Sequence, residues 1–99
     1  MSGVDELVTW YRAQLDVTAT ALATAAMHDS WRTYLLAEVE AKRRILRLYE
    51  NALSAHRSGS ISLRNRTQDE AVVEVLGEAV KELAVAMAGR EGYREEWRP

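Results

Sequence analysis

Two residues of opposite charge, Glu38 and Lys42, lie four positions apart within an otherwise apolar helical stretch at 35–53. Side chains with this spacing share one helix face, and an acid N-terminal to a base is the favourable order for an ion pair. Three interpretations follow: a half-buried ion pair of the fold, a charged pair that sets register at a subunit interface, or a catalytic acid or base at Glu38 tuned by Lys42.

The stretch that carries this pair has a wide apolar face. Leu35, Val39 and Leu46 fall within about 40° of one another, since each residue advances about 100° around a helix. Trp31 and Tyr49 lie to one side, so apolar side chains cover close to half of the helix. The wide arc favours a protein-interaction surface. Its candidate residues, including two near the C-terminus, are Trp31, Leu35, Glu38, Lys42, Tyr49, Tyr93 and Trp97.

No other group of residues predicts a catalytic or metal site. The chain has no cysteine, and its two histidines are His28 and His56. They would lie at opposite ends of one helix, roughly 40 Å apart at about 1.5 Å per residue. Neither a glycine-rich phosphate loop nor a Ser/His/Asp spacing is present. We therefore expect no catalytic residues, no metal, no cofactor and no enzymatic activity.

The net charge of −2 hides an uneven distribution along the chain. Four acids and one arginine give residues 2–30 a charge of −3, and eight basic and three acidic residues give 31–66 a charge of +5. Five acids and one lysine give 67–89 a charge of −4. We expect these oppositely charged segments to pack side by side, whereas the alternative is a basic surface for phosphate or an acidic protein.

Nucleic-acid binding is the second functional hypothesis. Its candidates lie on the basic face of the second expected helix and in the loop after it: Arg43, Arg44, Arg47, Arg57, Arg64 and Arg66. Two features disfavour it. The pI of about 5.7 is far below that of basic nucleic-acid-binding domains, and the loop is too long for a helix-turn-helix.

Apolar residues recur with three- and four-residue spacing over most of the chain, which predicts helices. The expected helices are at about 4–26, 31–56 and 68–88. Asp29 or Ser30 is the expected cap of the second helix. The sequence TQDE at 67–70 matches a capping box that would begin the third. Gly77 lowers helix stability relative to alanine, so it indicates a close packing contact.

The remaining segments are a basic loop at 57–66 and a tail at 90–99. Tyr93 and Trp97 lie four positions apart in this tail, and we expect their rings to dock on the helices. Proline occurs once, at Pro99, and strand signals are nearly absent. The predicted fold is all-α: a single domain, 1–99, folded as a three-helix antiparallel bundle with a C-terminal aromatic arm.

The apolar residues and the N-terminal sequence indicate the cellular location and the partners of the protein. No apolar run approaches the roughly 20 residues that span a bilayer. The N-terminus has acids where a secretory signal would carry lysine or arginine. We therefore expect a cytoplasmic protein without membrane contact. Three tryptophans and four tyrosines are more aromatic residues than one core of a 99-residue chain needs. Because the surplus would be exposed, we expect a protein partner or a homodimer.

Three pieces of the sequence resemble a family of small uncharacterised proteins from actinobacteria and their phages. They are ELVTWYRAQLD at 6–16, LAEVEAKRRIL at 36–46 and GYREEWRP at the C-terminus, together about a third of the chain. The motifs AEVEAKRR and YREEWRP match closely, and the N-terminal piece matches more loosely. The family has no established activity, so the resemblance implies a source rather than a reaction.

The chain also departs from that family. Its members often carry a TPGPW segment and a variable insert, some with Cys and His, whereas this chain has TATALATAAMHDSW there. A metal role of such inserts therefore does not transfer. The leading hypothesis is a small intracellular, non-enzymatic helical protein-interaction module, host-directed if it is phage-encoded. The alternative is a nucleic-acid-binding accessory protein, and an enzyme that uses Glu38 is the third hypothesis.

Overall fold

A computed structural model describes residues 3–58 and 63–99, with the backbone alone for residues 3 and 63–66. Its elements are α1 (Gly3–Thr24), α2 (Asp29–Ser58), α3 (Leu63–Val85) and a short 3-10 helix, η1 (Glu95–Trp97). The described ranges contain no strand. The prediction of an all-α, three-helix protein is confirmed.

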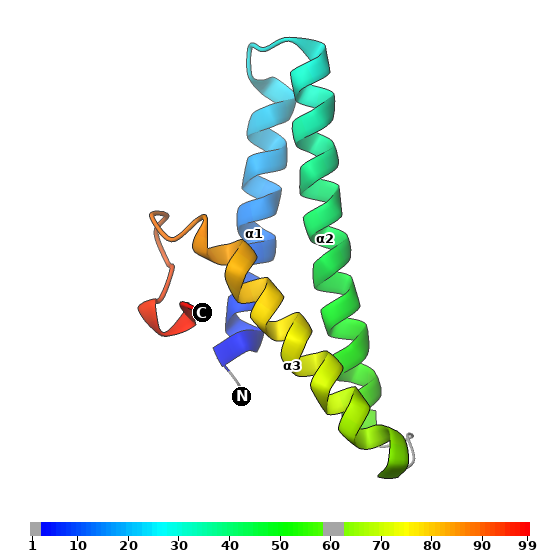
Figure 1. Cartoon of the computed structure of the whole chain (residues 1–99). Helices are drawn as coiled ribbons and strands as arrows, with labels where there is room; N and C mark the ends of the chain where they lie inside the picture. The colour runs from blue at the N-terminus through cyan, green and yellow to red at the C-terminus, as the bar shows by residue number, and fades with distance from the viewer. Residues whose placement is uncertain (1–2, 59–62) are drawn as a thin grey trace.

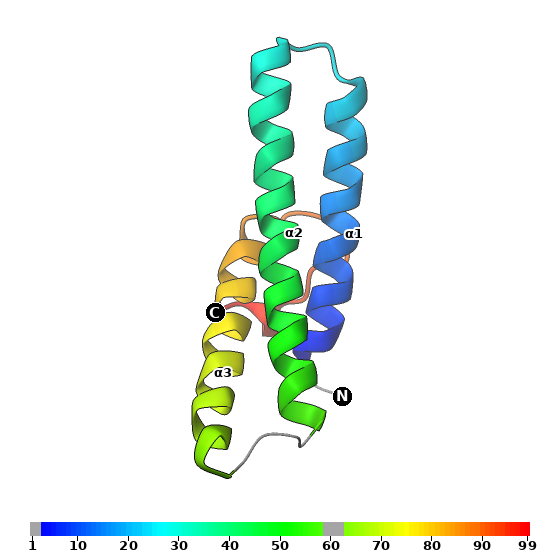
Figure 2. The same ribbon diagram turned by 90° about the vertical axis from the view of Figure 1, so that its right-hand side faces the viewer.

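α1 and α2 form a long antiparallel hairpin, and α3 crosses its lower half diagonally (Figure 1). Figure 2 shows that α3 ends about midway along α2, so the upper half of the hairpin has only two helices. The molecule measures 53 × 28 × 17 Å and has a radius of gyration of 15.7 Å, against about 13 Å for a compact domain of this length. The bundle is elongated, and its third helix covers part of it.

The core lies where the three helices and the C-terminal arm meet. Leu7, Tyr11 and Leu15 are fully buried at four-residue spacing on α1. Leu46 of α2 and Val80 of α3 belong to the same cluster. Burying each large apolar side chain contributes about 1.5–3 kcal/mol to stability. The other buried members are Val8, Val39, Tyr49, Ala84 and Trp97.

Side chains cap both helices at the turn between α1 and α2. The Nδ1 of His28 accepts the backbone N–H of Ser30 at 3.2 Å, and the His28 carbonyl accepts the backbone N–H of Arg32 at 3.1 Å. His28 therefore caps α2, instead of the two residues after it. The Arg32 guanidinium donates to the carbonyls of Leu22 (3.0 Å) and Ala25 (2.6 Å), groups that a helix end otherwise leaves unpaired.

α3 begins at Leu63, earlier than the expected residue 68. The expected capping box at 67–70 lies inside the helix, so that prediction is wrong. Neither glycine nor proline interrupts residues 63–70, and leucine and arginine are good helix formers, which explains why the helix extends back past Thr67. The first part of α3 is tied to α2 by His56 and Asp69, whose Nδ1 and Oδ2 lie 3.1 Å apart.

The expected basic loop at 57–66 is wrong in extent. Its first two residues belong to α2, and its last four belong to α3. Residues 59–62 lie outside the described part of the chain. α1 ends two residues before the expected position, and α2 extends two residues beyond each expected end. The loop prediction failed because no proline or glycine marks the true start of α3.

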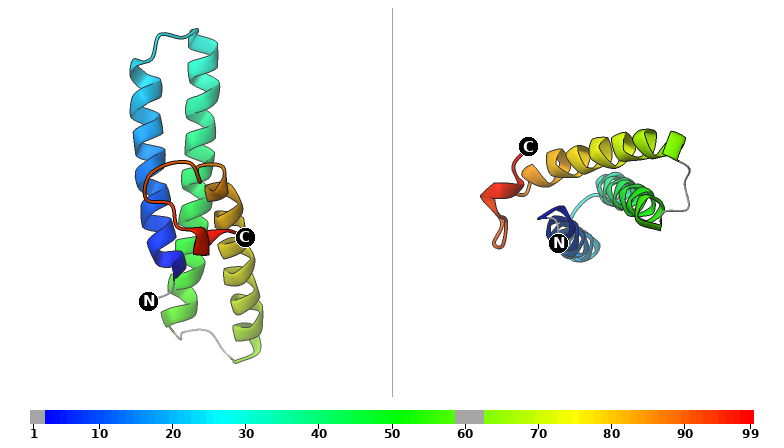
Figure 3. Two further views of the ribbon diagram at one scale, coloured as in Figure 1. Left: turned by 90° about the vertical axis from the view of Figure 1, so that its left-hand side faces the viewer. Right: turned by 90° about the horizontal axis from the view of Figure 1, so that it is seen from below.

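The C-terminal arm docks on α1, as expected. Figure 3 shows the chain turning back after α3 and running across to α1. The Trp97 ring is 4% exposed, and its centroid lies 5.6 Å from those of both Trp10 and Tyr93. Trp10 also donates its Nε1–H to the Glu91 carbonyl at 3.1 Å. The arm is thus a packed part of the fold.

Ion pairs join the acidic first helix to the basic second helix. Arg43 lies 2.6 Å from the Asp16 carboxylate and 2.5 Å from that of Glu40. Arg57 lies 3.1 Å from the Asp5 carboxylate. The hydrogen bond to Asp16, and to a smaller extent the one to Glu40, raises the pKa of the Arg43 guanidinium. The expected packing of oppositely charged segments is confirmed for α1 and α2.

Candidate functional site

The upper half of α2 extends past the end of α3. A methyl group at Gly77 of α3 would lie 3.5 Å from Cε1 of Tyr49 on α2, so these two residues lie side by side. α3 ends at Val85, eight residues after Gly77. Because α2 runs antiparallel to α3, the end of α3 is level with the α2 residue eight positions before Tyr49, which is Ala41. The α2 side chains at and above this boundary form what we call the distal surface: Trp31, Tyr34, Leu35, Glu38 and Lys42.

Two aromatic rings dominate the distal surface. Trp31 is 62% exposed and Tyr34 is 56% exposed. Their ring centroids lie 6.2 Å apart, with the planes at 89°. Trp31 precedes Tyr49 by about five helical turns and shares its face, which α3 covers lower down. Large exposed aromatic side chains of this kind are typical of interaction surfaces.

The two charged residues of the distal surface do not pair with each other. Glu38 is exposed and Lys42 is half-buried. A hydrogen bond to Glu38, reinforced by the charge of that carboxylate, raises the pKa of the Tyr34 phenol. The interpretation of Glu38 and Lys42 as an ion pair of the fold is therefore wrong: no ion pair joins them in the described structure, and Glu38 interacts with Tyr34 one turn earlier. An interface role for the pair and a catalytic role for Glu38 stay predictions.

Three other candidates of the interaction surface are packed against this chain's own core. Tyr49 and Trp97 are each 4% exposed, and Tyr93 is half-buried. They hold the fold together and offer little free surface. Sequence reasoning missed Trp10, on which the arm docks, because Trp10 lies off the buried stripe of α1. The signal for it was an aromatic residue outside that stripe together with an unexplained aromatic pair in the tail.

The arginines of the nucleic-acid hypothesis have unequal surroundings. Arg43 and Arg57 are neutralised by the ion pairs to α1 described above. Arg44 and Arg47 are exposed on α2 and make no ion pair with any described residue. The other two candidates are in the first turn of α3, with side chains outside the described structure: Arg64 and Arg66. The hypothesis stays a prediction and now depends chiefly on Arg44 and Arg47.

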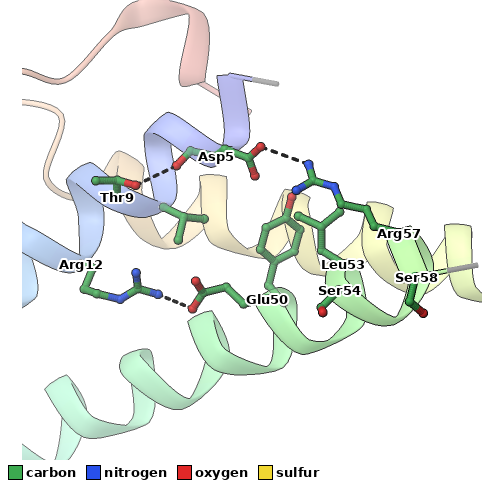
Figure 4. A pocket seen from close by; sticks show the side chains of 10 residues that line it. Asp5, Thr9, Arg12, Glu50, Leu53, Ser54, Arg57 and Ser58 are labelled. Carbon is green, nitrogen blue, oxygen red and sulfur yellow. Dashed lines mark hydrogen bonds and ion pairs between the residues drawn. The ribbon is translucent and has the colours of Figure 1, made fainter. Parts of the chain in front are cut away.

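A groove of about 550 Å³ opens between the lower halves of α1 and α2 (Figure 4). Two ion pairs bridge it, Arg12 with Glu50 and Arg57 with Asp5. Each arginine is thus neutralised by a carboxylate, so an anionic ligand would have to displace that carboxylate. Sequence reasoning missed the groove because its walls come from two helices far apart in the chain.

The described residues form neither a metal-binding cluster nor a membrane-spanning helix. Within residues 3–58 and 63–99, no three His, Cys, Asp or Glu side chains are placed to hold one metal ion. His28 and His56 lie just before and near the end of α2, respectively. No helix of the described chain has the length and apolarity needed to cross a bilayer.

Comparison with known proteins gives one family. The model of a family of unknown function, DUF6221, matches residues 28–99, which are 72 of the 99 residues of the chain. The matched segment begins at the His28 cap and includes α2, α3 and the arm, with the motifs AEVEAKRR and YREEWRP. No curated protein and no solved structure matches the chain.

Proposed function

The chain belongs to this family of unknown function, and from its own surface we propose that it is a non-enzymatic protein-interaction module that binds through the distal surface. One observation carries the proposal. Trp31 and Tyr34 are exposed as a ring pair on the same α2 face that α3 covers lower down. An interaction role explains why the aromatic face of α2 continues beyond the end of α3, the helix that packs on it.

The distal surface has the composition of a binding site. Covering the exposed part of Trp31 removes on the order of 150 Å² of surface, which contributes roughly 4 kcal/mol before the costs of association. Tyr34 adds a second ring beside it. Tryptophan and tyrosine are the residues that most often dominate binding energy at interfaces. Glu38 and Lys42 border the rings, where charges select the partner.

Site-specific photo-crosslinking in cells tests the proposal. A benzophenone amino acid replaces Tyr34, and in a matched control it replaces Val75, an apolar residue of α3 that is 66% exposed. We expect a covalent adduct with another protein chain from position 34 and none from position 75. Equal adducts at both positions, or none at position 34, would contradict the proposal. The mass of the adduct identifies the bound chain.

A further inference from the structure

We infer that the partner of the distal surface is a second copy of this chain, bound antiparallel about a twofold axis across the upper half of the α1–α2 hairpin. The inference rests on the proposed function and names its partner. Three observations support it: the excess accessible surface, the position of α3, and the charges of the distal surface.

The accessible surface of the chain is larger than that of a compact monomer. It measures 6561 Å² for a mass of 11.2 kDa, whereas a folded monomer of that mass exposes about 5,700 Å². The excess of roughly 900 Å² is close to the about 800 Å² that each partner buries in a standard interface. A second hairpin laid on the upper half would bury an area of this size.

The position of α3 restricts how a second hairpin can bind. α3 already covers the lower half of this face (Figure 1). A second hairpin therefore fits over the upper half and points in the opposite direction, with its own α3 at the far end. The part of α2 beyond the end of α3 runs from Asp29 to Ala41, so the twofold axis passes near its middle residue, Leu35. Together the two hairpins form a four-helix arrangement.

The side chains of the distal surface suit a symmetric contact. The antiparallel register brings Trp31 of each copy close to Glu38 of the other copy, where the indole N–H can donate to the carboxylate. The surface carries one acid and one base, so two identical surfaces meet without net repulsion. On α1 the upper half has mostly small side chains, VTATALAT at 17–24, which permit close approach of a second hairpin.

Single cysteines test the register directly, because the chain has none of its own. Leu35→Cys places a thiol near the proposed axis, where the two copies of the residue meet. Arg44→Cys is the control, since Arg44 is exposed on the opposite side of α2. We expect mild oxidation to link Leu35→Cys into a dimer and to leave Arg44→Cys a monomer. Equal linking of both variants, or no linking of Leu35→Cys, would overturn the inference.

Sedimentation equilibrium of the full chain separates this inference from the proposed function. We expect a dimer whose dissociation constant rises roughly 30-fold in Trp31→Ala, as for loss of an interface hot spot. A dimer unaffected by Trp31→Ala overturns the inference. A monomeric wild type with a photo-adduct to a different protein at position 34 also overturns it, but leaves the proposed function standing. A monomer without any adduct contradicts both.

Discussion

Gly92 shows at the scale of one residue how the arm is held on α1. Its φ is +93°, a backbone conformation that side chains disfavour. A methyl group there would also lie 2.6 Å from Nε1 of Trp10. Glycine is thus required both by the turn and by the close approach of the arm to the indole ring.

Gly92→Ala is expected to lower the free energy of unfolding by about 1–3 kcal/mol, because it adds backbone strain and displaces Trp10. Urea denaturation measures the loss. Gly89→Ala is the matched control, since a methyl group at Gly89 meets nothing within 4 Å. Equal stability of the two variants would show that the backbone conformation at Gly92 and its contact with Trp10 do not require glycine.

Tyr11 gives the chain a pH-dependent weakness. Its side chain is fully buried, and its hydroxyl has no hydrogen-bond partner within the described structure. Burial raises the pKa of the phenol to about 12, from about 10 in the unfolded chain. The fold favours the neutral phenol, so this contribution to stability is complete below pH 10 and is lost as the pH rises from about 10 towards 12.

Tyr11→Phe is expected to keep or raise stability at pH 7, because it removes a buried hydroxyl that lacks a partner. It is also expected to lose less stability than the wild type between pH 10 and 12. Urea denaturation followed by circular dichroism at pH 7, 10 and 11 measures both effects. A variant that loses stability in parallel with the wild type would show that the Tyr11 phenol ionises freely in the fold.

Among the helices, the sequence predicted the packed stripes better than the boundaries. Leu7, Tyr11 and Leu15 follow a period that only a buried helix face explains, and all three are in the core. The start of α3 was misplaced because a capping pattern at 67–70 competes with a longer helix, and local sequence does not decide between them. Whether Trp31 is covered depends on where α3 ends, and the sequence around Trp31 does not predict that position.

Gly77→Ala is expected to stabilise α3. Alanine exceeds glycine in helix propensity by about 1 kcal/mol. The new methyl group would lie 3.5 Å from the Tyr49 ring, an ordinary van der Waals distance. Urea denaturation should therefore show an increase of about 0.5–1 kcal/mol in unfolding free energy. The bulkier Gly77→Val should lose this gain, and a destabilised Gly77→Ala would mean that the α2–α3 contact is closer than described.

Two of the tryptophans support different parts of the molecule: Trp97 is buried and fixes the arm on α1, whereas Trp31 is exposed and lies beyond the end of α3. Trp97→Ala should lower the unfolding free energy by about 3–5 kcal/mol, because it empties a buried site. Trp31→Ala should change it by less than about 0.5 kcal/mol in dilute solution, since the ring is 62% exposed. Thermal and urea unfolding at low protein concentration compare them. Equal losses would place Trp31 in the core.

On the scale of the whole molecule, the fold class and the aromatic arm followed from the sequence, whereas the uneven coverage of the hairpin did not. Three helical patterns predict a bundle, but they do not give the angle at which α3 crosses. That crossing, with the early start of α3, leaves the upper hairpin as a two-helix layer (Figure 2). The distal surface is a consequence of this arrangement and could be located only in three dimensions.

Fluorine NMR of the 5-fluorotryptophan-labelled chain determines whether Trp31 lies at a binding surface. The chain has three tryptophans, and Trp31→Phe identifies the signal of Trp31. We predict that this signal shifts and loses its solvent isotope effect as the protein concentration rises, while the signal of the buried Trp97 stays constant. A Trp31 signal that keeps full solvent exposure at every concentration, and after addition of cell extract, would contradict the claim.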